Sequence, residues 1–169
     1  MANPELLFRG TPNRGVSLFV PKERVGRGSS ERLVVSAAPD RTVATEFVVP
    51  IEDLKVVIGS IGGVRYYVCG DKQPFKEKDK GGAIYTLNPE GFEYNPDIGI
   101  WTSTKPVETT SQEDVSSGLE AMIEAGIQVF FVDSETFNQF KESSDKGREI
   151  LRNLTSENMR RDKNVRVIP

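Results

Sequence analysis

The chain contains no histidine, and cysteine occurs once, as Cys69. Histidine is the commonest general base and the commonest metal ligand at neutral pH, so its absence excludes every catalytic triad that depends on an imidazole. A lone cysteine excludes an internal disulfide framework and a cysteine-based metal cluster. We therefore expect no metal cofactor.

Long apolar runs are also missing. No stretch approaches the roughly 20 apolar residues that a membrane-spanning helix needs, and the first five residues lack the basic region and apolar core of a signal peptide. We expect a soluble cytoplasmic protein with no membrane partner, although a delivered effector or a virus-encoded protein would have the same features.

An excess of positive charge is absent too. The formal net charge is -3, from 22 basic and 25 acidic residues. Nucleic-acid-binding proteins usually carry a basic excess, so the net charge does not support such a partner, although a local basic patch remains open.

The composition indicates a folded protein. The chain has 169 residues, of which 37% are hydrophobic and 28% charged, which is typical of one globular domain spanning residues 1–169. Apolar and β-branched runs predict short strands at residues 6–9, 16–20, 32–37, 54–58, 64–69, 83–87, 92–94, 98–103, 127–132 and 164–168. Residues 22–31 show no periodicity and predict an exposed loop, and residues 71–80 predict a charged excursion.

The glycine-rich segment 59–63 lies between two of these predicted strands. A loop that cradles phosphate requires a helix after it, and here a strand-like run follows. We therefore interpret the segment as a hairpin connection.

Helix signals concentrate in the last third of the chain. Ser111 resembles a helix cap, and the apolar residues that follow it have helical spacing up to Gly126 at the expected end. That stripe consists of Val115, Leu119, Met122 and Ile123. Further helices are predicted from Ser134, with Phe137 and Phe140 on one face, and from Ser144 or Asp145, with Ile150, Leu151 and Leu154 on one face.

One helix is predicted earlier. It begins near Pro39 and Asp40 and presents Val43, Ala44 and Phe47 on one face. Short strands throughout and helices mainly late in the chain predict an α+β fold of short mixed and antiparallel strands.

The first candidate site lies in the run Leu6 to Thr11. Arg9 would project a planar five-donor fork from the end of a buried strand, a geometry suited to phosphate or carboxylate. Gly10 would allow a ligand close to the backbone, and Thr11 adds a hydroxyl. The alternative interpretation is ordinary: an arginine at a strand end followed by a turn glycine.

Residues 7–12, the segment 33–40, and Ala44 with Phe47 resemble the front half of the ADP-ribosyltransferase fold. In that family a first strand ends in arginine or histidine followed by glycine, and a second ends in small and hydroxyl residues before a helix. The resemblance implies a split sheet, binding of NAD+ as a substrate between these strands, and transfer of ADP-ribose to a protein, nucleic-acid or small-molecule acceptor. It covers about the first fifty residues with short motifs.

The resemblance also implies roles for single residues. Arg9 matches the arginine of the arginine–serine–glutamate class, and Arg9, Gly10, Thr11 and Ser36 would bind NAD+. After Ser36, however, Ala37 and Ala38 replace the hydroxyl residues of the family motif.

The family's catalytic glutamate has no match. It opens a late strand and stabilises positive charge on the ribose, whereas the aligned position here is Ile100. Glu93 and Glu108 are the neighbouring candidates for catalysis together with Arg9, and each can equally be a surface carboxylate. The histidine-containing class is excluded, and the Glu-x-Glu pair of arginine-modifying transferases is absent.

The sequence thus predicts an ADP-ribosyltransferase-like protein with weak or no activity. The alternative is a non-enzymatic binding or regulatory module on the same scaffold, since fold does not dictate function.

Overall fold

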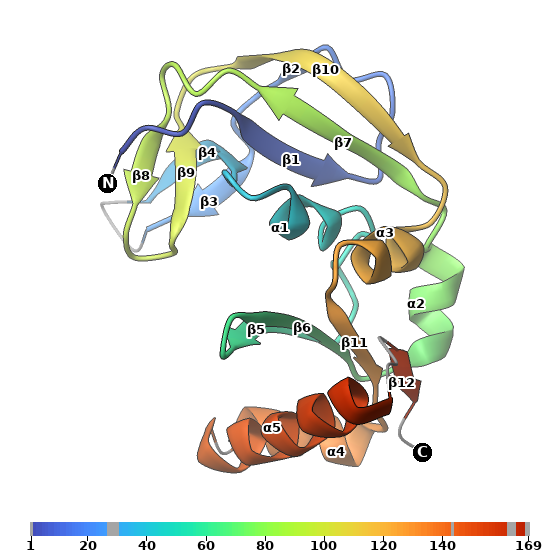
Figure 1. Ribbon diagram of the computed structural model, residues 1–169. Coiled ribbons are helices and arrows are strands. Elements are labelled where there is room, and N and C mark those ends of the chain that lie inside the picture. The colour runs from blue at the N-terminus through green and yellow to red at the C-terminus, as the bar shows by residue number, and fades with distance from the viewer. Residues whose placement is uncertain (1, 27–30, 143, 162–164, 168–169) are drawn as a thin grey trace. The chain divides into compact units, whose positions relative to one another are not determined.

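The computed structural model describes residues 2–26, 31–142, 144–161 and 165–167. The chain adopts an α+β fold with mainly antiparallel strands, and its helices lie mostly late in the sequence, which confirms the predicted fold class. The chain divides into two compact units, whose helices and strands are labelled in Figure 1. Unit 1 comprises Met1–Val48 and Gly81–Val115, and unit 2 comprises Val49–Lys80 and Ser116–Pro169.

Unit 1 contains two four-stranded antiparallel sheets. The first has the order β1 (Leu7–Thr11), β7 (Gly82–Leu87), β10 (Val107–Val115) and β2 (Leu18–Phe19). The second has the order β3 (Glu23–Val25), β4 (Arg32–Ala37), β9 (Ile100–Ser103) and β8 (Glu93–Asn95). Reciprocal backbone hydrogen bonds of 2.7 and 3.0 Å between Phe8 and Ala38 join β1 to the end of β4, and the strands curl into a half-barrel.

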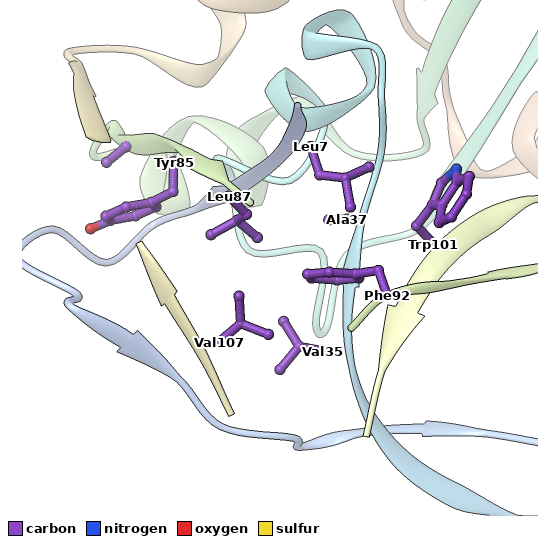
Figure 2. Close-up of a cluster of buried hydrophobic side chains, with 9 residues drawn as sticks. Leu7, Val35, Ala37, Tyr85, Leu87, Phe92, Trp101 and Val107 are labelled. Carbon is purple, nitrogen blue, oxygen red and sulfur yellow. The ribbon is translucent and has the colours of Figure 1, made fainter. Parts of the chain in front are cut away.

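The inner sides of these strands form one hydrophobic core (Figure 2). Both sheets contribute buried side chains to it: Leu7, Val35, Ala37, Ala83, Tyr85, Leu87, Phe92, Trp101 and Val107. The buried Tyr85 also satisfies its hydroxyl, which donates to the carbonyl of Asn13 at 2.9 Å and accepts from the amide of Val16 at 3.1 Å. The core residue therefore also holds the loop between β1 and β2.

Two segments of unit 1 differ from the sequence prediction. Residues 22–31 were expected to be a loop but include β3, which pairs with β4. The capped helix expected from Ser111 is instead the second half of β10, and Ser111 pairs with Thr86 of β7. Hydroxyl and carboxylate residues favour a helix start locally, but the hydrogen bonds and packing offered by β7 decide the structure here.

The early helix is shorter than predicted. α1 (Arg41–Thr45) begins after Asp40, whose carboxylate accepts a hydrogen bond from the amide of Thr42 at 2.8 Å. Ala44 is buried as expected, but Phe47 is 41% exposed because the helix ends before it. The prediction that Phe47 packs on a neighbouring strand is therefore wrong.

Unit 2 is built on a mixed sheet. Its order is β12 (Val165–Val167), β11 (Gln128–Phe131), β6 (Val64–Cys69) and β5 (Val56–Ile61), with β11 parallel to both neighbours. Gly62 and Gly63, with φ of 58° and 79°, form the two-residue turn between β5 and β6. Both residues need positive φ in such a turn, which glycine adopts at little cost. The predicted hairpin is confirmed, but its connection is shorter than the predicted segment 59–63, because residues 59–61 belong to β5 and pair with β6. The predicted C-terminal edge strand is confirmed over Val165–Val167; residues 164 and 168 lie outside the described part of the chain.

Four helices accompany this sheet: α2 (Lys72–Lys78), α3 (Gly118–Glu124), α4 (Ser134–Glu142) and α5 (Ser144–Arg161). Residues 71–80 were predicted to be a charged excursion, but they contain α2. Asp71 caps this helix, and the side chain of Phe75 within it is fully buried. α3 begins later than predicted, after Ser117, so Val115 is not part of its stripe. α4 is capped by Asp133 rather than Ser134; the hydrogen bonds from Thr136 lower the pKa of that carboxyl group. Within the described residues, no helix is both long and apolar enough to cross a membrane.

Candidate functional site

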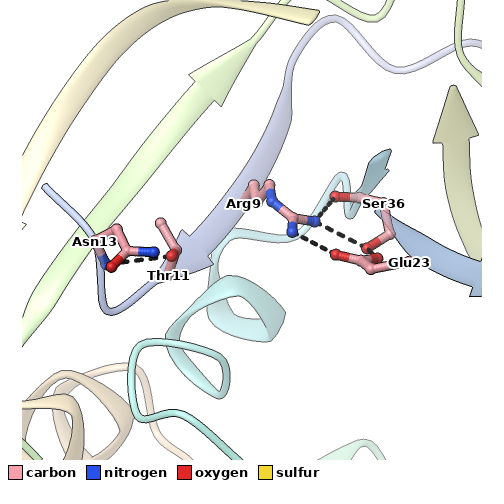
Figure 3. A network of polar contacts seen from close by, with 5 residues as sticks. All are labelled: Arg9, Thr11, Asn13, Glu23 and Ser36. Carbon is pink, nitrogen blue, oxygen red and sulfur yellow. Dashed lines mark hydrogen bonds and ion pairs between the residues drawn. The ribbon is translucent and has the colours of Figure 1, made fainter. Parts of the chain in front are cut away.

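Three strands of unit 1 bring one polar side chain each to a common point (Figure 3). Arg9 is the third of the five residues of β1, so it does not lie at the strand's end as predicted. It donates from Nη1 to the carbonyl oxygen of Ser36 at 2.7 Å and to its Oγ at 3.0 Å. The other terminal nitrogen of Arg9 pairs with the carboxylate of Glu23. The hydroxyl of Ser36 in turn donates to the second oxygen of Glu23. Arg9, Glu23 and Ser36 form a closed ring of polar contacts, which we call the Arg9 site.

The strand pairing explains why these residues meet. The Phe8–Ala38 bridge holds β1 beside the end of β4, where Ser36 lies. Glu23 pairs with Val34, so its side chain emerges on the same face of the second sheet as Val34 and Ser36. Each contact depends on tertiary pairing between residues that are distant in the sequence.

The surroundings of Arg9 limit its freedom. Its side chain is 21% exposed, and the guanidinium carbon lies 5.0 Å from the ring centroid of Phe19. An aromatic face at that distance attracts a cation. Nε of Arg9 is buried and has no hydrogen-bond partner, so one donor of the fork remains unused. An external anion can bind here only by competing with Glu23 or sharing the guanidinium with it.

Sequence reasoning missed Glu23. Its strand has three residues, whereas alternation becomes a usable strand signal over about four to eight residues. Flanking charges and glycines therefore suggested a loop, and no local feature marked Glu23 as the partner of Arg9.

Gly10 and Thr11 have structural environments of their own. A Cβ on Gly10 would lie 1.8 Å from the carbonyl oxygen of Ala44, so α1 packs directly on this glycine. Thr11 is buried, and its hydroxyl accepts a hydrogen bond from the amide of Asn13 at 3.2 Å. The close approach that Gly10 allows is thus already used by α1, and a ligand contact of Gly10 or Thr11 stays a prediction.

The two candidate glutamates lie in different sheets. Glu93 on β8 pairs with Thr102, which pairs with Ser36, so these three side chains share one face of the second sheet. Two strand spacings of about 4.8 Å separate the backbones of Glu93 and Ser36. Glu108 instead pairs with Leu18 between β10 and β2 of the first sheet. Both glutamates are exposed.

Ile100, the position aligned with the family's catalytic glutamate, lies on β9 opposite Asn95. It is two residues from Thr102 and therefore shares the face that carries Ser36 and Glu93. The structure places an aliphatic side chain there, and the carboxylate that touches Arg9 comes from Glu23.

The described residues contain no group of three or more cysteine, aspartate or glutamate side chains arranged to hold a metal ion. Comparison of the chain with known protein families, with curated proteins and with solved structures finds no match. The geometry of the Arg9 site is therefore the remaining indication of function.

Proposed function

We propose that unit 1 is an ADP-ribosyltransferase-like module that binds NAD+ at the Arg9 site and transfers ADP-ribose weakly or not at all. One observation carries the proposal. Arg9 in the middle of β1 and Ser36 near the end of β4, the two strands that resemble the family, are hydrogen-bonded to each other across 27 residues of sequence. A carboxylate, Glu23, completes an arginine–serine–glutamate set.

Each residue has a chemical role in this proposal. The guanidinium of Arg9 binds the pyrophosphate, for which its planar fork is suited. Glu23, oriented by the hydroxyl of Ser36, faces the positive charge that develops on the ribose when the bond to nicotinamide breaks. Glu93 lies on the same face of the sheet and is the second carboxylate within reach of a long dinucleotide.

The same geometry is the reason to expect low activity. Glu23 neutralises Arg9, so binding a phosphate requires the loss or sharing of an existing ion pair. A carboxylate held by an arginine also stabilises a cationic transition state less than a free one, because the two charges offset each other.

Binding and chemistry can be tested separately. We expect Arg9→Ala to weaken NAD+ binding in calorimetric titration by about 1.5–3 kcal/mol, the range for a charge-assisted hydrogen bond. We expect Glu23→Gln to tighten NAD+ binding, because it frees Arg9, and to reduce nicotinamide release to background. Glu93→Gln and Glu108→Gln, measured alongside, identify any catalytic carboxylate other than Glu23.

Glu113→Gln is the matched control. Glu113 forms an exposed ion pair with Arg41 at 2.6 Å in the same unit, away from Arg9 in the sequence and on a different strand pair. It should change neither binding nor release. Unchanged NAD+ affinity in Arg9→Ala would contradict the proposed site.

The alternative is a non-enzymatic module on the same scaffold. It is favoured by the closed ring of contacts, in which Arg9, Glu23 and Ser36 bind one another without a ligand and leave only Nε of Arg9 as a buried donor without a partner. NAD+ binding with background nicotinamide release in the wild type and in all glutamate variants would favour a binding module. Absence of NAD+ binding would leave the Arg9 site as a structural device that joins β1, β3 and β4.

A further inference from the structure

The chain passes between the two units three times. The crossings follow from the boundaries of the units and lie at Val48–Val49, Lys80–Gly81 and Val115–Ser116. Crossings that are far apart in sequence could leave a unit at widely separated points. The contacts within each unit show that these three do not.

In unit 1 the crossings meet in one small apolar cluster. Val48, which ends the first segment, packs with Ile84 and Val115. Val115 also pairs with Gly82, at the start of the second segment, across the β7–β10 ladder. The three connections therefore leave unit 1 from neighbouring positions.

In unit 2 the same convergence is built around Asp79. Its carboxylate accepts hydrogen bonds from the hydroxyl of Ser117 at 2.9 Å and from the amides of Gly118 at 2.7 Å and Leu119 at 3.0 Å. The second crossing is thereby tied to the third over about forty residues of sequence. Asp79 also serves the start of α3, whose first amides lack partners within the helix.

Gly118 connects this contact group to the first crossing, because it lies against Val49. A Cβ at Gly118 would lie 2.4 Å from Cγ2 of Val49, 3.3 Å from the amide nitrogen of Val49 and 3.3 Å from Oδ1 of Asp79. Val49 and Asp79 thus both lie against the position that a side chain of residue 118 would occupy. Val49 is the first residue of unit 2 after the first crossing, and Ser117 and Gly118 are the second and third residues after the third crossing. All three take part in these contacts.

We propose that Val49, Asp79 and Gly118 form a clamp that couples the three chain crossings, so that loosening one crossing loosens all three. Asp79 is the positioning residue of this clamp. Its charge-assisted bonds hold the second and third crossings, and Gly118 transmits that arrangement to Val49 through packing.

Hydrogen exchange measured by mass spectrometry on the full chain tests the clamp. The decisive segment is residues 45–52, which the clamp reaches through the packing of Val49 against Gly118. We expect Asp79→Ala to raise amide exchange both at residues 116–120 and at residues 45–52, by roughly tenfold or more, as the loss of charge-assisted bonds implies. Asp79→Asn, which keeps one acceptor oxygen, should give a smaller rise at both segments.

Asp133→Ala is the matched control. Asp133 caps α4 through the amide of Thr136 at 2.7 Å, so it is an aspartate cap whose partner lies three residues away. This variant should raise exchange in α4 and leave residues 45–52 and 116–120 unchanged. A rise in Asp79→Ala that stays confined to residues 116–120 would overturn the clamp and reduce Asp79 to a helix cap.

Discussion

At the scale of single residues, Arg9 and Gly10 are adjacent but serve different parts of unit 1. Arg9 joins three strands through Glu23 and Ser36. Gly10 allows α1 to pack against β1 at backbone distance. A motif that suggested one ligand site therefore divides into a polar contact group and a packing contact.

This division predicts a large effect for Gly10→Ala. The added methyl group would collide with the backbone carbonyl of Ala44, which cannot move without shifting α1. We expect a loss of about 3 kcal/mol or more in the free energy of unfolding, at the upper end of overpacking effects. Chemical denaturation monitored by circular dichroism measures the loss.

Gly59→Ala is the comparison. There the new methyl group would meet the hydroxyl end of the Tyr66 side chain at 2.3 Å, and that half-buried ring can rotate away. The loss of stability should be clearly smaller than for Gly10→Ala. Equal losses would mean that α1 yields as easily as a side chain and that Gly10 is not needed for packing.

At the scale of elements, the apolar stripe predicted for α3 is correct in its later residues, but the helix begins after the predicted start. Met122 is fully buried and packs in the core of unit 2 with Ile127, Val129 and Phe131, as the spacing predicts. Leu119 is only partly buried. Val115 belongs to β10 and packs in unit 1. Gly126, with φ of 85°, follows the C-cap residue Ala125, as expected for a glycine that ends a helix.

These environments rank two substitutions in α3. Met122→Ala should cost about 2–5 kcal/mol, as truncation of a fully buried side chain does. Leu119→Ala should cost markedly less, because part of its side chain already contacts water. The two denaturation midpoints, measured under one set of conditions, check the order. A larger cost for Leu119→Ala would contradict the packing of α3 on β11.

At the scale of the whole molecule, the chain provides one natural probe in each unit. Trp101 is the sole tryptophan and is buried in the core of unit 1. Cys69 is the sole cysteine and is buried in unit 2, where burial raises the pKa of its thiol and the Sγ donates to the carbonyl of Asp71 at 3.2 Å. The native thiol should therefore react slowly with a disulfide reagent near pH 8.

The sequence prediction of one domain becomes testable with these probes. If residues 1–169 unfold as one cooperative domain, Trp101 fluorescence and Cys69 reactivity should give the same transition in urea, because coincident probes mark two-state unfolding. Cys69→Ser, followed by fluorescence alone, controls for effects of the reagent. Transitions at clearly different urea concentrations would show that the two units unfold independently.

Elements with a strong apolar pattern could be predicted from the sequence alone. β4, β6 and β11 were predicted to within a residue or two, since β-branched and aromatic runs bury well in sheets and gain little elsewhere. A hairpin was equally clear, because strand-like runs lie on both sides of the glycine-rich segment 59–63, but the shorter turn at Gly62 and Gly63 was not predicted.

The short and polar elements could not be predicted from the sequence, because their conformation depends on tertiary contacts. β3, α2 and the second half of β10 carry charged and hydroxyl residues whose local preferences are weak or point to another structure. Their state depends on partners supplied from elsewhere in the chain, such as β4 for β3 and β7 for β10. Arg9 was visible as a candidate from the sequence, but its carboxylate partner was not, because Glu23 meets it through strand pairing and not through sequence spacing.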